Sequence, residues 1–199
     1  MQIQYREEQV IYLDALRRDD MSLIVKWRNE SPEGTRTPYL LTEEMQMAWY
    51  ADVVCNRDSL HRYWAVRQRR TFDEQKNAVR SGDDPGPRLI GISGLTNIQW
   101  ENSRAEIALL IAPSRRGRGH GAVALLKTLH EGFDRMRLNY IHGETYLCNT
   151  SLPFWQKMAE RYAYHIGNLP NRKFWDGCWH DSYYFDIRNC APIEKGELK

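Results

Sequence analysis

Cysteine is scarce in this 199-residue sequence, which has only Cys55, Cys148, Cys178 and Cys190. None belongs to a CxxC pair, so the spacing is not that of a zinc site and we expect no bound metal. No apolar run approaches the roughly 18 residues that a membrane-spanning helix needs. The N-terminus also lacks the apolar segment of a signal peptide. These absences predict a cytoplasmic protein with reduced cysteines and no membrane partner.

An excess of one charge sign is missing as well. Lys and Arg total 28 and Asp and Glu total 26, which gives a net charge of +2 at pH 7. A dedicated nucleic-acid binder is usually far more basic, so we expect no nucleic-acid partner. Most of the basic residues are nevertheless Arg, whose guanidinium binds phosphate and carboxylate groups in a bidentate manner. The composition therefore favours small anionic molecules as ligands.

Length and composition predict one globular domain. A chain of 199 residues with 42% hydrophobic residues can bury a core without disulfides or metals. We find no internal repeat and no low-complexity segment. We therefore expect a single domain over 1–199, with a structured core from about 9 to 187 and a loose tail over 188–199.

The pattern of apolar residues predicts an α/β architecture, a mixed sheet with helices packed on it. We expect strands at 9–15, 63–66, 88–100, 104–112, 141–147 and 179–187. We expect helices at 20–27, 43–53, 122–136 and 152–162. The highly charged stretch 67–87 predicts a long hairpin connection with room for a helical turn. Residues 167–171 predict a turn.

The most distinctive stretch is Arg116-Gly117-Arg118-Gly119-His120-Gly121, which joins a predicted strand to a predicted helix. Glycines let the backbone approach a ligand closely and adopt positive φ. Free N–H groups and the helix dipole attract an anion to a helix start. Together these features make a cradle for a pyrophosphate. The loop is neither a P-loop nor a dinucleotide-binding fingerprint, and a solvated basic turn is the alternative interpretation.

The motif Arg116-x-x-Gly119-x-Gly121 resembles the Arg/Gln-x-x-Gly-x-Gly/Ala signature of the GNAT superfamily of N-acetyltransferases. The surrounding order is also similar: a strand precedes the loop, a long helix follows, and a later helix carries Phe154-Trp155-Gln156-Lys157. Trp27-Arg28-Asn29 and the C-terminal segment resemble the RimJ/RimL-like branch. The resemblance covers about 9–187.

This resemblance implies a GNAT-like fold, a mostly antiparallel twisted sheet with a V-shaped splay between its central strands and helices on both sides. It implies direct transfer of an acetyl group from acetyl-CoA, a co-substrate, to a primary amine, without a metal. The acceptor stays open among a protein N-terminus, an amino-sugar nucleotide and a small amine such as a polyamine. The alternatives are a non-catalytic acyl-CoA-binding or sensor domain and a nucleic-acid-binding domain.

The resemblance also implies a set of cofactor-binding residues. Backbone groups near Leu110 or Ile111 would polarise the thioester carbonyl, and Asn149 and Ser151 would contact the pantetheine arm or the sulfur. For Asn149 the alternative is a cap at the end of a strand, and for Ser151 an N-cap. The full expected set is Leu110, Ile111, Arg116, Gly117, Arg118, Gly119, His120, Gly121, Ala122, Asn149, Ser151 and Trp155.

The chemistry needs a base for the amine and an acid for the departing thiolate. We expect Glu106 to be the base, with Glu144 as a weaker candidate. A salt bridge to Arg104 or to a neighbouring strand is the alternative role of Glu106. In many members of the family, a tyrosine of the helix that corresponds to 152–162 acts as the acid that protonates the thiolate. Trp155 stands at that position here. We therefore name Tyr162 as the acid, while Tyr146 and Tyr164 are also available, and packing is the alternative role for all three.

Two further expectations concern the acceptor site and the association of subunits. Acceptor choice in this family lies in variable segments, which correspond to 29–58 and 67–87 here. The exposed face of the predicted strand 179–187 is compatible with pairing between two subunits, and hence with a homodimer.

Overall fold

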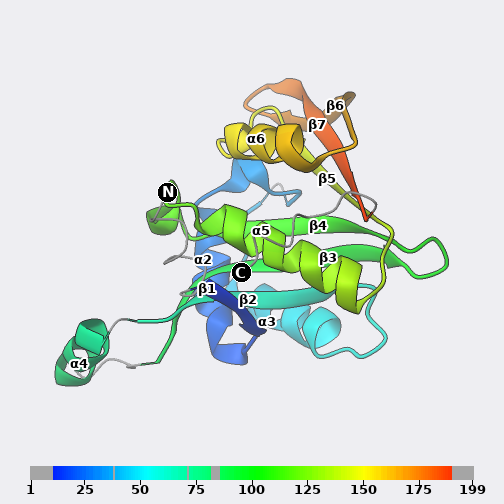
Figure 1. Ribbon diagram of the computed structural model, residues 1–199. Coiled ribbons are helices and arrows are strands. Elements are labelled where there is room, and N and C mark those ends of the chain that lie inside the picture. Colours follow the sequence, from blue (N-terminus) through cyan, green and yellow to red (C-terminus); the bar gives the residue numbers. More distant parts are fainter. Residues whose placement is uncertain (1–10, 38, 71, 82–85, 190–199) are drawn as a thin grey trace.

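The computed structural model describes residues 11–37, 39–70, 72–81 and 86–189, and shows one mixed sheet covered by helices (Figure 1). The seven strands have the order β1-β2-β3-β4-β5-β7-β6. Only β4 and β5 pair in parallel, and every other neighbouring pair is antiparallel. This confirms the predicted α/β mixed sheet. The strands are β1 (Ile11–Ala15), β2 (Arg62–Gln68), β3 (Arg88–Gln99), β4 (Arg104–Ile111), β5 (Tyr140–Tyr146), β6 (His165–Trp175) and β7 (Cys178–Arg188).

Helices cover both faces of the sheet because each has one apolar side. On one face, α5 and α6 bury Leu125, Leu129 and Trp155 against β3, β4, β5 and β7. On the other face, α2 and α3 enclose a second cluster that contains Met21 and Trp27. The helices are α2 (Met21–Asn29), α3 (Glu43–Trp49), α4 (Phe72–Ser81), α5 (His120–His130) and α6 (Leu152–Tyr162). Single π-helical turns, Tyr50–Val54 and Glu131–Arg135, extend α3 and α5.

The centre of the sheet opens where β4 and β5 meet. Their ladder contains only the pairs Arg104↔Tyr140, Ala105↔Ile141 and Glu106↔His142. Both strands continue beyond this point, to Ile111 and Tyr146 respectively, without pairing with each other. The V-shaped splay that the family resemblance implied is therefore present, and it lies between β4 and β5.

The segment 167–171 was wrongly predicted as a turn, since it belongs to strand β6. Its Gly, Asn and Pro residues favour turns, but here they produce an irregular strand at the sheet edge. The register with β7 shifts between Leu169 and Lys173, and Asn171 has a φ of 52°. The true reversal is at Asp176 and Gly177, with φ values of 49° and 79°, as an Asp-Gly hairpin requires. Strand β7 is consequently internal, and the edge is β6.

Other boundaries differ less. The charged connection contains a full helix, α4, on an arm that projects from the body of the protein (Figure 1). At the arm's base, Nε of Arg70 donates to the carbonyl of Gly86 at 3.0 Å. Helix α5 begins at His120, before the predicted Ala122. Arg188 belongs to β7, whereas the expected strand start at 9–10 and the tail from 190 lie outside the described residues. In the described part of the chain, no helix combines the length and apolarity needed to cross a bilayer.

Candidate active site

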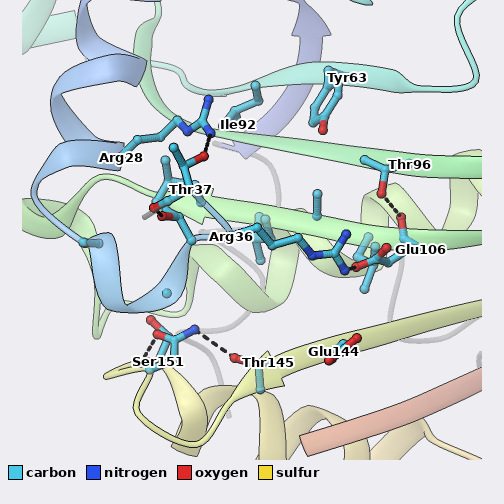
Figure 2. A pocket seen from close by; sticks show the side chains of 18 of the residues that line it. Arg28, Arg36, Thr37, Tyr63, Ile92, Thr96, Glu106, Glu144, Thr145 and Ser151 are labelled. Atoms are coloured by element: carbon cyan, nitrogen blue, oxygen red, sulfur yellow. Dashed lines mark hydrogen bonds and ion pairs between the residues drawn. The ribbon is translucent and has the colours of Figure 1, made fainter. Parts of the chain in front are cut away.

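A cavity of about 370 Å³ occupies the opening between β4 and β5 (Figure 2). Strands β2 to β5 and helices α2, α3 and α6 contribute to its walls. The segment 31–37, which we call the strap, crosses from α2 toward β5 and forms another wall. The lining residues are Ile24, Arg28, Ser31, Gly34, Thr35, Arg36, Thr37, Gln46, Trp49, His61, Tyr63, Ile92, Thr96, Asn97, Glu106, Ile107, Ala108, Leu109, Leu110, Arg116, Glu144, Thr145, Tyr146, Asn149, Ser151 and Trp155.

The Arg/Gly loop lies at one end of this opening. Gly117 and Gly119 have φ values of 73° and 81°, which favour glycine, and Gly119 is the N-cap of α5. Gly121 and Ala122 lie in the first turn of α5, where backbone N–H groups lack intrahelical acceptors. His120 is buried, and its Nδ1 is hydrogen-bonded to the carbonyl of Arg115 at 3.1 Å, so its ring braces the loop.

Arginine side chains surround the loop. Arg116 donates from Nε to the carbonyl of Ile111 at 3.0 Å and from a terminal nitrogen to Oγ of Ser31 at 2.8 Å. This holds its guanidinium at the cavity wall. Burial lowers the pKa of Arg115, and the nearby positive charges of Arg88 and Arg118 lower it further. Such a concentration of positive charge beside a helix start fits a polyphosphate ligand.

The opposite rim combines the end of β5 with the start of α6. Nδ2 of Asn149 donates to Oγ1 of Thr145 at 2.8 Å, and Oδ1 of Asn149 accepts from the backbone N–H of Ser151 at 2.9 Å. Ser151 is at the N-cap position of α6, but its hydroxyl makes no capping hydrogen bond there. The strap passes so close that a Cβ at Gly34 would lie 3.0 Å from Oδ1 of Asn149. Trp155 packs against Phe185 with ring centroids 5.5 Å apart.

Glu106 is an acid of the cavity lining with partners at both carboxylate oxygens (Figure 2). Its carboxylate forms an ion pair with Arg36 of the strap. The other oxygen accepts from Nδ2 of Asn97 at 2.9 Å. Asn97 reaches it because the β3–β4 register is irregular beyond Thr96 and Asn97 adopts a φ of 49°, as bulged residues do. Among the described residues, the ion pair of Glu106 is therefore with the strap and not with Arg104, and its contact with the neighbouring strand β3 is the hydrogen bond from Asn97.

Alternate residues of β5 point to the cavity side of the sheet. Among them, Glu144 accepts from Nε of Arg172 at 3.0 Å and from Oγ of Ser182 at 2.7 Å. Burial opposes its charged form, but these hydrogen bonds outweigh that effect and lower the pKa of Glu144. Glu144 is consequently an ionised carboxylate whose Oε1 accepts both of these hydrogen bonds.

Of the three tyrosines considered as the acid, only Tyr146 lines the cavity. Burial raises the pKa of Tyr146, so its hydroxyl stays protonated to a higher pH than that of an ordinary tyrosine. Tyr162 is the last residue of α6 and packs against the main core cluster. Tyr164 is 67% exposed. A further cavity tyrosine, Tyr63, has its pKa raised to about 12 by burial.

The three residues of the Trp27-Arg28-Asn29 motif have separate structural roles. Trp27 is buried in the core beneath α2. Asn29 makes two side-chain hydrogen bonds to the backbone of Leu41, at 2.8 and 2.9 Å, which fix the segment that follows α2. Arg28 lines the cavity and donates to Oε1 of Gln46 and to Oγ1 of Thr37, both at 3.1 Å.

Lys173 of β6 fastens the strap to the other half of the sheet. Its buried ammonium donates to the carbonyls of Pro32, Glu33 and Thr35 at 2.7, 2.9 and 2.6 Å. It also lies 4.9 Å from the ring centroid of Tyr146. Burial lowers the pKa of Lys173. The strap is thus held in place by a charge contributed from the far edge of the sheet.

The structure gathers Glu106, Leu110, Arg116, Asn149, Ser151 and Trp155 around one cavity, with the rest of the loop beside it. Ile111 and Tyr162 are outside the lining. Of the two segments expected to choose the acceptor, 29–58 contributes seven lining residues, and no described residue of 67–87 lines the cavity. Sequence reasoning missed Arg36, Asn97 and Lys173, whose surroundings carry no motif. Within the described ranges, no three His, Cys, Asp or Glu side chains are placed to hold one metal ion.

The family model "Acetyltransferase (GNAT) domain" matches residues 11–152. No curated protein matches the chain significantly. A mutant form of the spermidine/spermine N-acetyltransferase SpeG from Vibrio cholerae has a similar fold, with a TM-score of 0.74, 20% identity, and coverage of 94% of this chain and 99% of that chain. The spermidine N-acetyltransferase from Vibrio cholerae in complex with CoA and spermine is also similar, with a TM-score of 0.72, 20% identity, and coverage of 91% and 96%. Since the family model spans well over half of its length, the chain belongs to the GNAT acetyltransferases, enzymes that use acetyl-CoA.

Proposed function

We propose that this protein transfers the acetyl group of acetyl-CoA directly to a primary amine that enters beside the strap. The observation that carries the proposal is the juxtaposition of three features. The Arg116 loop lies at one end of the β4–β5 opening, the strand ladder is interrupted there, and Glu106 stands on the cavity wall. Membership of the RimJ/RimL-like branch is supported by Trp27-Arg28-Asn29, since each of its residues has a defined role.

The residues present fit acetyl-CoA. The positive-φ glycines and the start of α5 suit the pyrophosphate, with Arg116 and Arg118 supplying charge. Asn149 and Ser151 would contact the pantetheine arm along the β5 rim. Backbone N–H groups at the end of β4, near Leu110, would polarise the thioester carbonyl.

The transfer forms a bond between the amine nitrogen and the acetyl carbon while the bond from that carbon to sulfur breaks. The amine must lose a proton, and Glu106 accepts it directly or through water. Because Arg36 and Asn97 engage both carboxylate oxygens, direct acceptance requires the amine to displace one of them. The departing thiolate takes a proton from Tyr146, the cavity tyrosine on β5 beside Glu144.

The first experiment is thermal unfolding with and without acetyl-CoA, in the wild type and in Arg116→Ala. At about 100 times Kd, binding should add about 2.7 kcal/mol, which for this length raises Tm by roughly 5–10 °C. The rise should shrink in Arg116→Ala and persist in Arg135→Ala, whose side chain is 70% exposed on the extension of α5.

The second step is turnover, measured as CoA thiol release that depends on an added amine. Release with wild type and its loss in Arg116→Ala would support the proposal. Acetyl-CoA binding without release for any amine would indicate a non-catalytic acyl-CoA-binding domain. No Tm rise at saturating acetyl-CoA would contradict the proposal.

A further inference from the structure

Arg28 differs from Glu106, Arg36 and Glu144, the charged residues of the cavity lining that form ion pairs. Glu106 is paired with Arg36, and Glu144 is paired with Arg172. Arg28 contacts only neutral oxygens, those of Gln46 and Thr37. Across the described parts of the chain, no carboxylate forms an ion pair with it.

In this respect Arg28 matches Arg116. Both line the cavity, both are held by neutral oxygens, and neither has an acidic partner among the described residues. Arg116 belongs to the loop proposed to bind the pyrophosphate of acetyl-CoA. By the same reasoning, the unpaired charge of Arg28 indicates a second anionic group in the filled site.

Burial and orientation strengthen this comparison. Arg28 is half-buried, and burial lowers its pKa, which shows that its charge is poorly solvated. A poorly solvated cation without a counter-ion is costly, and an anionic ligand offsets that cost. Gln46 is 1% exposed and its Nε2 donates to Sδ of Met21 at 3.8 Å, so its oxygen is turned toward Arg28. Only two of the five guanidinium N–H groups are used by these two partners.

We propose that Arg28 binds a carboxylate or phosphate group on the acceptor, so that the substrate is a primary amine that also carries a negative charge. This inference rests on the proposed function and names the class of its second substrate. Ile92 and Tyr63 line the wall that runs from Arg28 toward Glu106 (Figure 2). They provide an apolar surface for the part of the acceptor between its anion and its amine.

The charge balance of the cavity disfavours a polycationic acceptor. Three Arg and two Glu side chains are in the lining, and both Glu residues are already paired with Arg. A polyamine would therefore meet an unneutralised positive charge at Arg28 and find no free carboxylate in the described lining. This separates the expected acceptor from the spermine bound by the structural neighbour.

Matched amines test the inference through the kcat/KM of thiol release. The first pair is glucosamine 6-phosphate and glucosamine, and the second is phenylalanine and 2-phenylethylamine, with spermidine as a polycation. We expect the anionic member of at least one pair to react about 10- to 100-fold more efficiently than its partner, as a charge-assisted hydrogen bond allows. Preference for glucosamine, 2-phenylethylamine and spermidine, which lack an anionic group, would overturn the inference.

Variants assign the preference to Arg28. Arg28→Met should remove most of the kcat/KM advantage of the amines that carry an anionic group. The kcat/KM of the amines that lack one and the Kd of acetyl-CoA should stay nearly unchanged. Arg28→Lys should restore part of the advantage. Gln46→Glu places a carboxylate beside the guanidinium and should abolish the anion preference without removing Arg28. Arg135→Met is the control. The assignment would be contradicted if, within each matched pair, the ratio of the two kcat/KM values were the same in wild type and in Arg28→Met.

A binding measurement separates this inference from the proposed function. If acetyl-CoA binds but no amine gives thiol release, the proposed acetyl transfer is contradicted. The role of Arg28 in binding an anionic group is then tested by ligand binding alone. Glucosamine 6-phosphate and phenylalanine are then added to the CoA-saturated protein. A rise in Tm with either probe in the wild type that is absent in Arg28→Met would support the anion site. Equal shifts, or none, would overturn it.

Discussion

Arg36 and Glu106 face each other across the cavity, one on the strap and the other on β4, and their ion pair joins segments 70 residues apart in the sequence. The proposed base, Glu106, is thus held by Arg36 of the strap, the segment beside which the acceptor is proposed to enter. If the acceptor enters beside the strap, as proposed, its binding is coupled to access to Glu106.

Glu106→Gln should lower kcat by about 10²- to 10⁴-fold, the usual contribution of a general base. The Kd of acetyl-CoA should be retained, because the Arg116 loop is unchanged. Glu144→Gln is the matched control, since Glu144 lines the same cavity but is engaged by Arg172 and Ser182. A Glu106→Gln enzyme with wild-type kcat would exclude Glu106 as the base.

Tyr146→Phe should lower kcat by about 10²-fold if Tyr146 protonates the thiolate, whereas Tyr162→Phe should change it little. Burial raises the pKa of Tyr146, and an acid works only while protonated. The alkaline limb of the wild-type kcat profile should therefore lie above the ordinary tyrosine pKa of about 10, and Tyr146→Phe should lose that limb. If Tyr162→Phe lost activity and Tyr146→Phe did not, Tyr162 would be the acid, as expected from the sequence.

Lys173→Met should weaken the strap and the fold together. The substitution removes three hydrogen bonds from a buried ammonium and leaves three carbonyls without that donor. We expect a loss of roughly 2–5 kcal/mol in the free energy of unfolding, measured in urea, and a higher KM for the acceptor. Arg172→Met, at the neighbouring half-exposed position, should change stability little. Equal stability of Lys173→Met and wild type would show that the strap is held by its other contacts.

Histidine protonation should destabilise the protein in mild acid. His142 lies between the rings of Tyr140 and Tyr184, and its buried Nδ1 has no hydrogen-bond partner in the described chain. Burial lowers its pKa, and nearby Arg104 lowers it too, while the charge of Glu106 opposes them. The unfolded chain then binds the proton more readily, so stability falls as pH drops below about 6.5. Urea unfolding at pH 7 and 5.5 should show a smaller difference in His142→Phe, and an unchanged difference would contradict this.

The α4 arm should be dispensable for acceptor choice. Gln68 and Arg88 pair directly at its base, so a short Gly-Ser linker in place of 72–85 can close the hairpin. We expect the relative kcat/KM values for a panel of amines to stay as in the full-length protein. If the relative kcat/KM values changed, 67–87 would contribute to the choice of acceptor, as expected from the sequence.

The parts of the fold with strong local signals were predictable. The alternating strands, the amphipathic α5 and the glycines of the Arg116 loop carry their information within a few residues. Strand β6 was missed because Asn168, Pro170 and Asn171 have turn propensity, and pairing with β7 overrides it. No local signal marks that irregular strand, since the sheet contacts that stabilise it are non-local.

Of the candidate site, the sequence predicted the proposed CoA side, Glu106 and the contribution of 29–58, but not the contacts that hold the strap. The Arg116 motif and Asn149 belong to regular element ends, where a pattern can be recognised. The acceptor wall depends on contacts between distant segments, such as Lys173 with Thr35, 138 residues apart. A single Lys or Arg on an edge strand or in a loop usually predicts a solvated charge, so sequence alone could not assign these positions.

The ladder between β4 and β5 ends at the pair Glu106↔His142. Beyond this pair, the described residues of these two strands, at the centre of the sheet, form no hydrogen-bonded pairs with each other. An extended ligand with amide groups that bound in that opening would supply the missing hydrogen bonds and would act as a temporary strand. Because a ligand that binds only the folded state stabilises it, occupancy should slow amide hydrogen exchange on both flanking strands. If acetyl-CoA binds there as proposed, the two half-sheets would be held together more firmly while it is bound than after it leaves.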